Sequence, residues 1–379
     1  MTPVPADGRI VIVGGSIAAA TAARSLRNRG HAGQVTLISS EDHPPYARPP
    51  LSKAVLTGTD VPESAYLPEL EGVELLLGVP AVGLDSAART VALADGREVG
   101  YDGLVIATGA RARTLPGGGD RVYTLRDLGD AQELGQLMRQ GARLLVVGGG
   151  PLGMEVASVG RELGTEVTLV SDTPPMEALL GAHLSGLLVE AATAAGVEII
   201  RQPVSELQQD QAGRPVAVLH DGRRVDGDVA FVAIGCQPNV EWLAGSGLAA
   251  GPRGLEVDEY LRVAPGIVAA GDVVAFPAES GCRRTPYWQS AFDQAVTAVE
   301  VLLGSGDAPH LPRPYFWTEQ FGHHVKLVGS VVGDDAPEEV PAAAGTVLRW
   351  RNSDGAPVGA AGIDCPLSIT KLRKLLASA

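Results

Sequence analysis

The chain has few cysteines, few aromatic side chains and a deficit of basic charge. Its 379 residues include three cysteines, Cys236, Cys282 and Cys365. They are too widely spaced for a redox dithiol, a zinc knuckle or an iron–sulfur clamp, whose cysteines stand close together. Lys and Arg number 30 against 44 Asp and Glu, a formal charge of −14. We therefore expect no metal site, and neither nucleic acid nor an anionic membrane as the main partner.

The sequence also lacks long apolar runs. No stretch approaches the roughly 18 uninterrupted apolar residues of a membrane-spanning helix. Residues 1–10 lack the basic start and apolar core of a signal peptide. Apolar residues make up 45% and charged residues 20%, values typical of a globular protein of two or three domains. These features predict a cytoplasmic protein, with a monomer or weak dimer as the default assembly.

One pattern of strand, glycine-rich turn, helix and strand occurs twice. An apolar run at 9–13 leads to Gly14-Gly-Ser, then to an Ala-rich helical stretch ending at Gly30 and a second run at 34–38. The second copy has runs at 143–147 and 166–170, which flank the turn 148–153 and a helix over 154–163. Apolar runs without alternation fit buried parallel strands. The pattern predicts an α/β fold with two Rossmann-like dinucleotide-binding domains.

The two glycine-rich turns differ in completeness. Gly148, Gly150 and Gly153 supply the three glycines of GxGxxG, which provide a tight turn, room for the pyrophosphate and close helix–strand packing. The first copy keeps Gly14, but Ser16 and Ala19 occupy the next two positions. The Cβ of Ser16 crowds a pyrophosphate, although its hydroxyl can donate to a phosphate oxygen. A merely structural turn remains the alternative for this copy.

An acidic residue after the second strand of such a unit usually binds the ribose hydroxyls. Glu41 occupies this place in the first copy, and the pair Ser171-Asp172 falls there in the second. Ser171 suits either a ribose or a 2′-phosphate. No arginine follows before Arg201, which favours NADH and leaves NADPH as the alternative coenzyme.

Several ordered motifs resemble those of one enzyme family. The segment His43 to Lys53 looks like the PYxRPPLSK signature of FAD-dependent ferredoxin reductases, such as those of Rieske dioxygenase systems. These belong to the pyridine nucleotide-disulfide oxidoreductase superfamily but have no redox cysteine pair. Further similar segments are Tyr101–Ala110, Leu125–Ala131, Gly148–Glu155, Ala233–Asn239, Val268–Asp272 and Tyr315–Gly322.

The resemblance implies roles for particular residues. Asp272 would accept hydrogen bonds from the flavin ribityl chain, and Arg48 and Lys53 would place positive charge near FAD. Glu155 would face the nicotinamide and pair with Lys53, and Trp317 would flank a cofactor ring. Other cofactor contacts are implied within the matched motifs, at Thr108, Gly109, Arg126, Gly235 and Gly271.

Each of these roles has an ordinary structural alternative. Asp272 could cap the segment that follows it, and Arg48 and Lys53 could lie on a solvated basic loop. Glu155 could be a surface glutamate, and Trp317 could pack in a core. The family's acidic residue two positions before Trp288 is replaced here by Pro286, which puts any flavin contact of that acid in doubt.

The resemblance and the pattern together predict three domains. Residues 1–111 and 240–310 would bind FAD, 112–239 would bind NAD(P)H, and 311–379 would form a C-terminal α+β domain. In the last, the runs 315–317, 325–332 and 346–350 predict a small antiparallel sheet, closed by a helix over 366–377.

The predicted activity is oxidation of NADH, with electron transfer through FAD to a [2Fe–2S] ferredoxin that serves a monooxygenase or dioxygenase. A nicotinamide transfers electrons in pairs, whereas a flavin can release them singly. One alternative is a flavoenzyme that acts directly on a small organic substrate. Another is a redox-sensing binding protein in which NADH reduces the flavin slowly.

Overall fold

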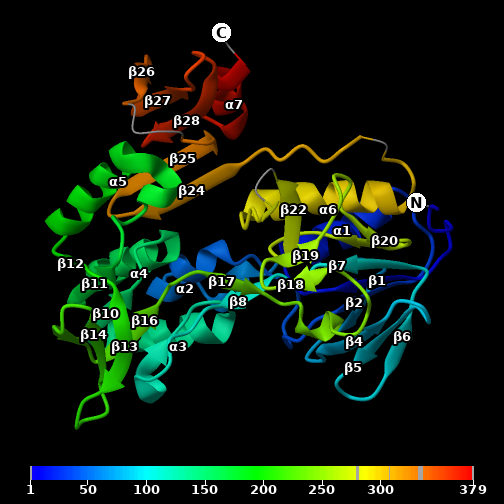
Figure 1. The fold of residues 1–379 in the computed structure, drawn as a ribbon, viewed down its shortest axis with the longest axis horizontal. Coiled ribbons are helices and arrows are strands. Elements are labelled where there is room, and N and C mark those ends of the chain that lie inside the picture. The colour runs from blue at the N-terminus through cyan, green and yellow to red at the C-terminus, as the bar shows by residue number, and fades with distance from the viewer. Residues whose placement is uncertain (1, 279–280, 307, 332–335, 378–379) are drawn as a thin grey trace. The chain divides into compact units, whose positions relative to one another are not determined.

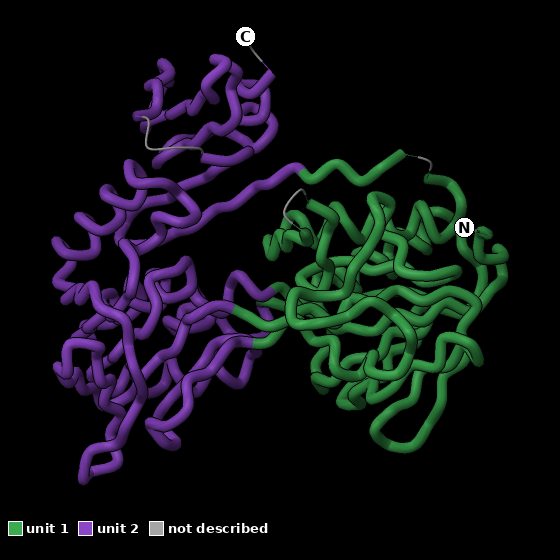
Figure 2. Tube along the Cα trace, viewed as in Figure 1, with its two compact units in different colours: residues 1–47, 65–111, 236–312 green, residues 48–64, 112–235, 313–379 purple. Residues whose placement is uncertain are grey.

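The computed structural model describes residues 2–278, 281–306, 308–331 and 336–377, which form two compact units (Figure 2). Unit 1 contains 1–47, 65–111 and 236–312, and unit 2 contains 48–64, 112–235 and 313–379. The chain therefore passes between the units several times. The division into three domains stays a prediction.

Unit 1 is built on a six-stranded sheet with the order β20-β21-β7-β1-β2-β3 (Figure 1). Strand β1 pairs in parallel with both β2 and β7. The elements are β1 (Ile10–Val13), α1 (Ile17–Asn28), β2 (Val35–Ile38), β3 (Glu74–Leu76), β4 (Ala81–Asp85), β5 (Thr90–Leu93), β6 (Glu98–Gly100), β7 (Gly103–Ile106), β8 (Ala110–Ala112), β17 (Cys236–Pro238), β18 (Ala250–Gly251), β19 (Gly254–Glu256), β20 (Arg262–Ala264), β21 (Ile267–Ala269), β22 (Val274–Ala278), β23 (Gly281–Arg283) and α6 (Trp288–Leu302).

Small side chains determine how the helices of unit 1 pack. Helix α1 has the sequence IAAATAARSLRN, and its alanines are buried against α6, which lies beside it (Figure 1). Alanine suits this position because it favours the helix and allows close approach of a neighbouring backbone. The buried residues of β1, β2, β7 and β21 complete the core.

Unit 2 contains a second parallel sheet, with the order β12-β11-β10-β16-β9. Its first part has η1 (Pro49–Ser52), α2 (Ala54–Thr57), β9 (Val122–Tyr123), α3 (Leu128–Arg139), β10 (Leu144–Val147), α4 (Pro151–Glu162), β11 (Val167–Ser171), α5 (Glu177–Ala194), β12 (Glu198–Arg201), β13 (Val204–Gln209), β14 (Pro215–Leu219), β15 (Arg224–Asp226) and β16 (Val229–Val232). Strand β10 pairs in parallel with β11 and β16, as β1 does with β2 and β7. The two predicted Rossmann-like units are therefore present.

The C-terminal part of unit 2 is the predicted antiparallel sheet with one helix. Its elements are β24 (Tyr315–Gln320), β25 (His323–Gly329), β26 (Glu338–Val340), β27 (Thr346–Arg351), β28 (Pro357–Ile363) and α7 (Ile369–Ala377). The strand order is β24-β25-β28-β27-β26. Of the run predicted over 325–332, residue 332 lies outside the described residues.

Two predicted helix starts were wrong. Helix α4 begins at Pro151 rather than at 154, because proline is favourable in the first turn, where its missing N–H costs nothing. Helix α7 begins at Ile369 rather than at 366, and the Ser368 hydroxyl accepts a 3.4 Å bond from the Lys371 amide. No helix among the described residues is both long and apolar enough to span a membrane.

Candidate functional site

The glycine-rich turn of unit 1 lies between β1 and α1. Gly14 has φ +141°, and a Cβ there would lie 2.1 Å from the Ala107 carbonyl oxygen, so the backbone itself requires glycine. Ser16 is the N-cap residue of α1, but its hydroxyl makes no capping bond and donates instead to the Tyr46 carbonyl at 3.3 Å. Ala19 is completely buried. The amides at the start of α1 are thus not capped by the Ser16 side chain.

The three glycines in the turn of unit 2 are not all present for the same reason. A Cβ on Gly148, at φ +112°, would lie 2.4 Å from the Ala233 carbonyl oxygen, and one on Gly153 would lie 1.9 Å from the Gly148 oxygen. A Cβ on Gly150, in contrast, would have no atom within 4 Å. The fold therefore requires the first and third glycines, and the second leaves open space at the N-terminus of α4. This space suits a pyrophosphate, which binds at helix N-termini.

The first glycine of the turn makes the same backbone hydrogen bond to the end of the second strand in both units. The Gly14 amide donates to the Ile38 carbonyl and the Gly148 amide to the Val170 carbonyl, each at 2.8 Å. This equivalence places Thr173, not Asp172, at the position of Glu41. The Glu41 carboxylate accepts a hydrogen bond from the Tyr46 hydroxyl. Asp172 and Thr173 are both exposed.

A cavity of about 530 Å³ lies at the carboxyl ends of β10, β11 and β16. Dinucleotides usually bind at this edge in such folds, because the strand order reverses at the first strand and leaves a crevice there. Its lining includes the predicted Gly148, Gly150, Ser171, Asp172 and Gly235. Sequence reasoning missed Pro174, Met176, Gln202 and Pro203, which also line it.

In unit 1, the loop after β7 is held to the segment after β17. The Thr108 hydroxyl donates to the Asn239 carbonyl at 2.8 Å, and the Asn239 side-chain amide donates back to the Thr108 carbonyl at 3.0 Å. The Asn239 backbone amide donates to the Gly109 carbonyl at 3.0 Å. Gly109 has φ +64°. These bonds join two segments that lie 131 positions apart in the chain.

Gly271 and Asp272 form a turn between β21 and β22. The Gly271 amide donates to the buried Gln294 side chain at 2.7 Å, and φ is +88°. The guanidinium of Arg284 donates to the Asp272 carbonyl at 2.8 and 3.1 Å. Because a strand follows this turn, Asp272 does not cap a helix. Asp272 is half-buried. The hydrogen bonds made by the Gly271 amide and by its own carbonyl hold its backbone in place.

Glu155 is a buried acid of unit 2. It lies on α4 and is 7% exposed. One carboxylate oxygen accepts hydrogen bonds from Lys53 Nζ at 2.8 Å and Ser52 Oγ at 2.5 Å, and the other accepts one from Thr318 Oγ1 at 2.7 Å. The pairing with Lys53 implied by the resemblance is present, and the surface-glutamate alternative is wrong. Three donors from two segments, 52–53 and the strand β24, fix this carboxylate.

Ser52 and Thr318 were not singled out in the sequence. Both lie in the matched segments, Ser52 directly before Lys53 and Thr318 directly after Trp317, so the motifs themselves were the available signal. Gln320 extends the cluster by donating to Thr318 Oγ1 at 2.9 Å. The ring of Trp317 is half-buried and stacks with Tyr315 at a centroid distance of 5.6 Å. Its predicted place beside a cofactor ring stays a prediction.

Arg48 and Arg126 are brought together in unit 2. The Arg48 guanidinium donates to the Arg126 carbonyl. The Arg126 amide donates at 2.6 Å to the carboxylate of Asp130, which also forms the capping box of α3 with Asp127. Burial raises the pKa of Asp130. The two arginines are thus tied to the start of α3, and their contact with a cofactor stays a prediction.

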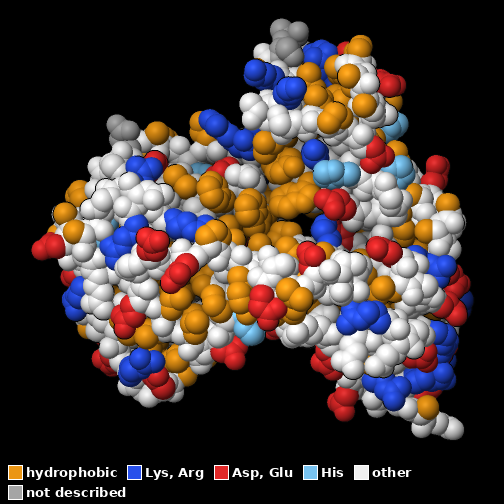
Figure 3. Space-filling view, turned by 180° about the vertical axis from the view of Figure 1, so that it is seen from behind, with side chains coloured by type: hydrophobic (Ala, Val, Ile, Leu, Met, Phe, Trp, Pro, Cys, Tyr) orange, Lys and Arg blue, Asp and Glu red, His pale blue; other side chains and the backbone are white. Residues whose placement is uncertain are grey.

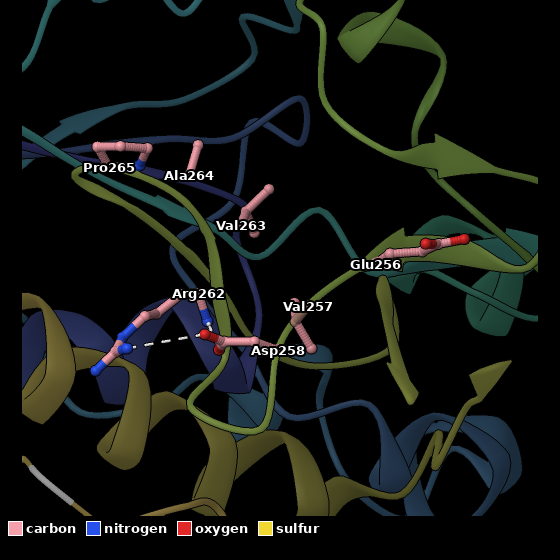
Figure 4. A pocket seen from close by; sticks show the side chains of 7 residues that line it. All are labelled: Glu256, Val257, Asp258, Arg262, Val263, Ala264 and Pro265. Carbon is pink, nitrogen blue, oxygen red and sulfur yellow. Dashed lines mark hydrogen bonds and ion pairs between the residues drawn. The ribbon is translucent and has the colours of Figure 1, made fainter. Parts of the chain in front are cut away.

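Two further cavities differ in the residues that line them. One of about 600 Å³ opens in unit 2 beside Lys53 and is lined partly by His323 and His324. The other, of about 480 Å³, lies in unit 1 along the segment Glu256 to Pro265, where Arg262 faces Asp258 (Figure 4). This second cavity includes none of the predicted site residues.

Charge is distributed without a large basic area on the face seen in Figure 3, where acidic and basic side chains are interspersed over each unit. In unit 2, for example, Arg143 and Arg214 form ion pairs with Asp226 and Asp228. Among the described residues, no group of three or more His, Cys, Asp or Glu side chains could hold a metal ion.

Comparison with known proteins identifies relatives along nearly the whole chain. The family described as "Pyridine nucleotide-disulphide oxidoreductase" matches residues 8–300. The ferredoxin–NAD(+) reductase component of the biphenyl dioxygenase system of Paraburkholderia xenovorans (strain LB400) is 34% identical over 92% of this chain and 85% of the relative. Rhodocoxin reductase of Rhodococcus erythropolis is 36% identical over 86% of this chain and 79% of the relative.

A solved structure shows the same fold. The covalent complex of putidaredoxin reductase with putidaredoxin matches with a TM-score of 0.87 and 27% identity, over 98% of this chain and 92% of the matched chain. The expected fold class is confirmed by this similarity.

Proposed function

Because the chain belongs to the pyridine nucleotide-disulphide oxidoreductase family, we propose that it is an FAD-dependent NADH:ferredoxin oxidoreductase. It takes electrons from NADH and delivers them to a [2Fe–2S] ferredoxin that serves an oxygenase. The names of its relatives support this proposal, since they are ferredoxin–NAD(+) reductase components of dioxygenase systems.

The residues present fit two dinucleotides. In unit 1, Gly14 and the turn of Gly271 and Asp272 would hold FAD. In unit 2, the cavity with Gly148, Gly150 and Asp172 would hold the coenzyme. The open space at Gly150, which the protein's own packing does not use, is the observation that fits a bound pyrophosphate there. FAD supplies the ability to accept a hydride from a nicotinamide and to release electrons one at a time.

The observation that carries the proposal is the fixed position of Glu155 on the helix that the second glycine-rich turn opens. Its carboxylate accepts hydrogen bonds from Ser52, Lys53 and Thr318. The Lys53 ammonium is thereby held beside the carboxylate at 2.8 Å with its side chain 20% exposed. A cation fixed in this way can stabilise negative charge that develops next to it. We assign this electrostatic role to Lys53, with Glu155 orienting it.

The chain supplies no dithiol between coenzyme and acceptor. None of the three cysteines forms a disulfide, and no two stand close together in the sequence. A relay of the Cys-X-X-Cys type is therefore not available, and electrons are expected to pass directly to the protein partner.

The visible spectrum of the purified protein tests the proposal. Flavin absorbance should be present, should bleach on anaerobic addition of NADH, and should recover as one equivalent of oxidised [2Fe–2S] ferredoxin is reduced. Bleaching without reduction of any of several ferredoxins would favour a direct organic substrate. Absence of flavin from protein purified with excess FAD would contradict the proposal.

Glu155→Gln tests the assigned residue. Because the amide holds the Lys53 ammonium less firmly than the carboxylate does, the rate of bleaching by NADH should fall about tenfold or more, with FAD still bound. Glu162→Gln is the matched control, since Glu162 lies on the same helix and is exposed. Equal rates in the two variants would remove Glu155 from the mechanism.

A further inference from the structure

We propose that Arg201 binds a 2′-phosphate, and that this chain accepts NADPH as a second coenzyme besides NADH. This inference rests on the proposed function, because it requires the coenzyme to lie in the cavity at the ends of β10, β11 and β16. It concerns only the adenosine end of that site.

Strand pairing brings Arg201 beside Ser171, one of the residues that line this cavity. Strands β11 and β12 are parallel neighbours, and Ser171 is the register partner of Arg201. Register partners lie about 5 Å apart and direct their side chains to the same face of a sheet. The register partners Thr168 and Glu198, three positions earlier in the same two strands, show this through a 3.2 Å hydrogen bond between their side chains. The separation of 30 positions between Ser171 and Arg201 hides this proximity in the sequence.

The residue at the end of β11 cannot exclude a 2′-phosphate. NADH-specific sites use an acid at the strand end, which binds the ribose hydroxyls and repels the phosphate. Ser171 is neutral and 5% exposed, and its hydroxyl lies 2.7 Å from where a Cβ on Gly149 would be. The position equivalent to Glu41 is Thr173, which is also neutral. Asp172 is therefore the one acid of the segment 171–173, and it is exposed.

Exposure weakens the repulsion that Asp172 can exert, since water screens the charge of a surface carboxylate. Within the described residues, Asp172 forms no ion pair, and its carboxylate accepts a bond from the Thr173 hydroxyl at 3.4 Å. It can bind a ribose hydroxyl, as the use of NADH requires, without strongly rejecting a phosphate.

Arg201 is available as a phosphate ligand. It is exposed, and in the described parts of the chain it forms no ion pair or side-chain hydrogen bond. The residues after it, Gln202 and Pro203, line the cavity wall. A guanidinium can donate two hydrogen bonds to one phosphate, and the charge makes these bonds strong.

Steady-state kinetics on the FAD-loaded protein test the proposal, with ferricyanide as an acceptor that bypasses any ferredoxin. We expect kcat/KM for NADPH to lie within about 100-fold of the value for NADH. Arg201→Ala should lower kcat/KM for NADPH about tenfold, the effect of about 1.4 kcal/mol, and change that for NADH less than about twofold. Arg224→Ala is the control, because Arg224 is exposed in the same unit and bonds to the neutral Gln208.

Equilibrium binding provides a readout besides activity. The same protein is titrated calorimetrically with 2′,5′-ADP and with 5′-ADP. The ratio of the Kd for 2′,5′-ADP to the Kd for 5′-ADP should rise about tenfold in Arg201→Ala. Asp172→Ala should shift the ratio in the opposite direction. An equal loss of affinity for both ligands, or of kcat/KM for both coenzymes, would overturn the proposal, because it would make the role of Arg201 merely structural.

The two proposals fail differently. If NADH reduces the protein but kcat/KM for NADPH is more than about 100-fold lower, the role of Arg201 is refuted and the proposed function stands. If neither coenzyme reduces the FAD-loaded protein, the proposed function itself fails.

Discussion

The hydroxyl of Thr318 donates a 2.7 Å hydrogen bond to the carboxylate of Glu155, although 163 positions separate them in the chain. Within unit 2, this bond joins strand β24 of the antiparallel sheet to helix α4 of the parallel-sheet layer. A second bond, from the Phe321 amide to the Ser158 hydroxyl at 2.7 Å, joins the turn after β24 to the same helix. The position of the buried acid therefore depends on the C-terminal part of the chain.

Replacing Thr318 should destabilise the protein. Thr318→Val keeps the shape but removes the donor to Glu155 and the acceptor for Gln320, both in buried surroundings. We expect the free energy of unfolding to fall by about 1–3 kcal/mol, the usual cost of an unsatisfied buried polar group. Thermal unfolding of the FAD-loaded protein measures this. Thr318→Ser, which retains the hydroxyl, should lose less, and equal loss in both variants would refute the role of the hydrogen bonds.

Two glycines of one turn should respond differently to alanine. Gly150→Ala places its Cβ in open space with φ −74°, so the thermal midpoint should not change. The Cβ should nevertheless crowd the pyrophosphate and raise KM for NADH about tenfold. Gly148→Ala should destabilise the fold, because its Cβ would meet the Ala233 carbonyl and φ is +112°. An unchanged KM in Gly150→Ala would place the coenzyme elsewhere.

Asp272 is predicted to hold FAD. Asp272→Ala removes the carboxylate and leaves the backbone bonds of Gly271 and Arg284 in place, so the protein should fold and lose FAD during purification. The ratio of flavin to protein absorbance measures the loss. Asp95→Ala, in an exposed turn of the same unit, should retain FAD. Stoichiometric FAD in the Asp272 variant would contradict the assignment.

His31 should make stability depend on pH. Burial lowers the pKa of His31 below its ordinary value of about 6.5, and its Nε2 lies 2.9 Å from the Gly8 carbonyl oxygen. The unfolded chain thus binds a proton more readily than the folded protein. This contribution to stability is fully present above the ordinary pKa and is lost as pH falls below it.

The variant His31→Gln isolates that contribution, because its amide can still donate to Gly8 but does not titrate. Between about pH 7.5 and about 5.5, the thermal midpoint of the variant should fall less than that of the wild type. The exposed His220→Gln serves as control and should follow the wild type. Parallel curves for all three proteins would show that His31 does not contribute.

Much of the fold could be predicted because the signals are local. The run 143–147, the turn at Gly148 and the run 166–170 are contiguous, and a buried parallel strand followed by a glycine-rich turn has few structural solutions. Helix starts were less predictable, as Pro151 shows, since a proline after glycines fits both a loop and a first helical turn.

The sequence by itself determined the two nucleotide-binding units, the antiparallel C-terminal sheet and the glycines at 148 and 153, because each follows from residues adjacent in the chain. Only the tertiary structure decided that Ser52 and Thr318 also meet Glu155 and that Arg201 neighbours Ser171. Strand order and the packing of distant segments set these contacts, and a single sequence carries no local signal for either.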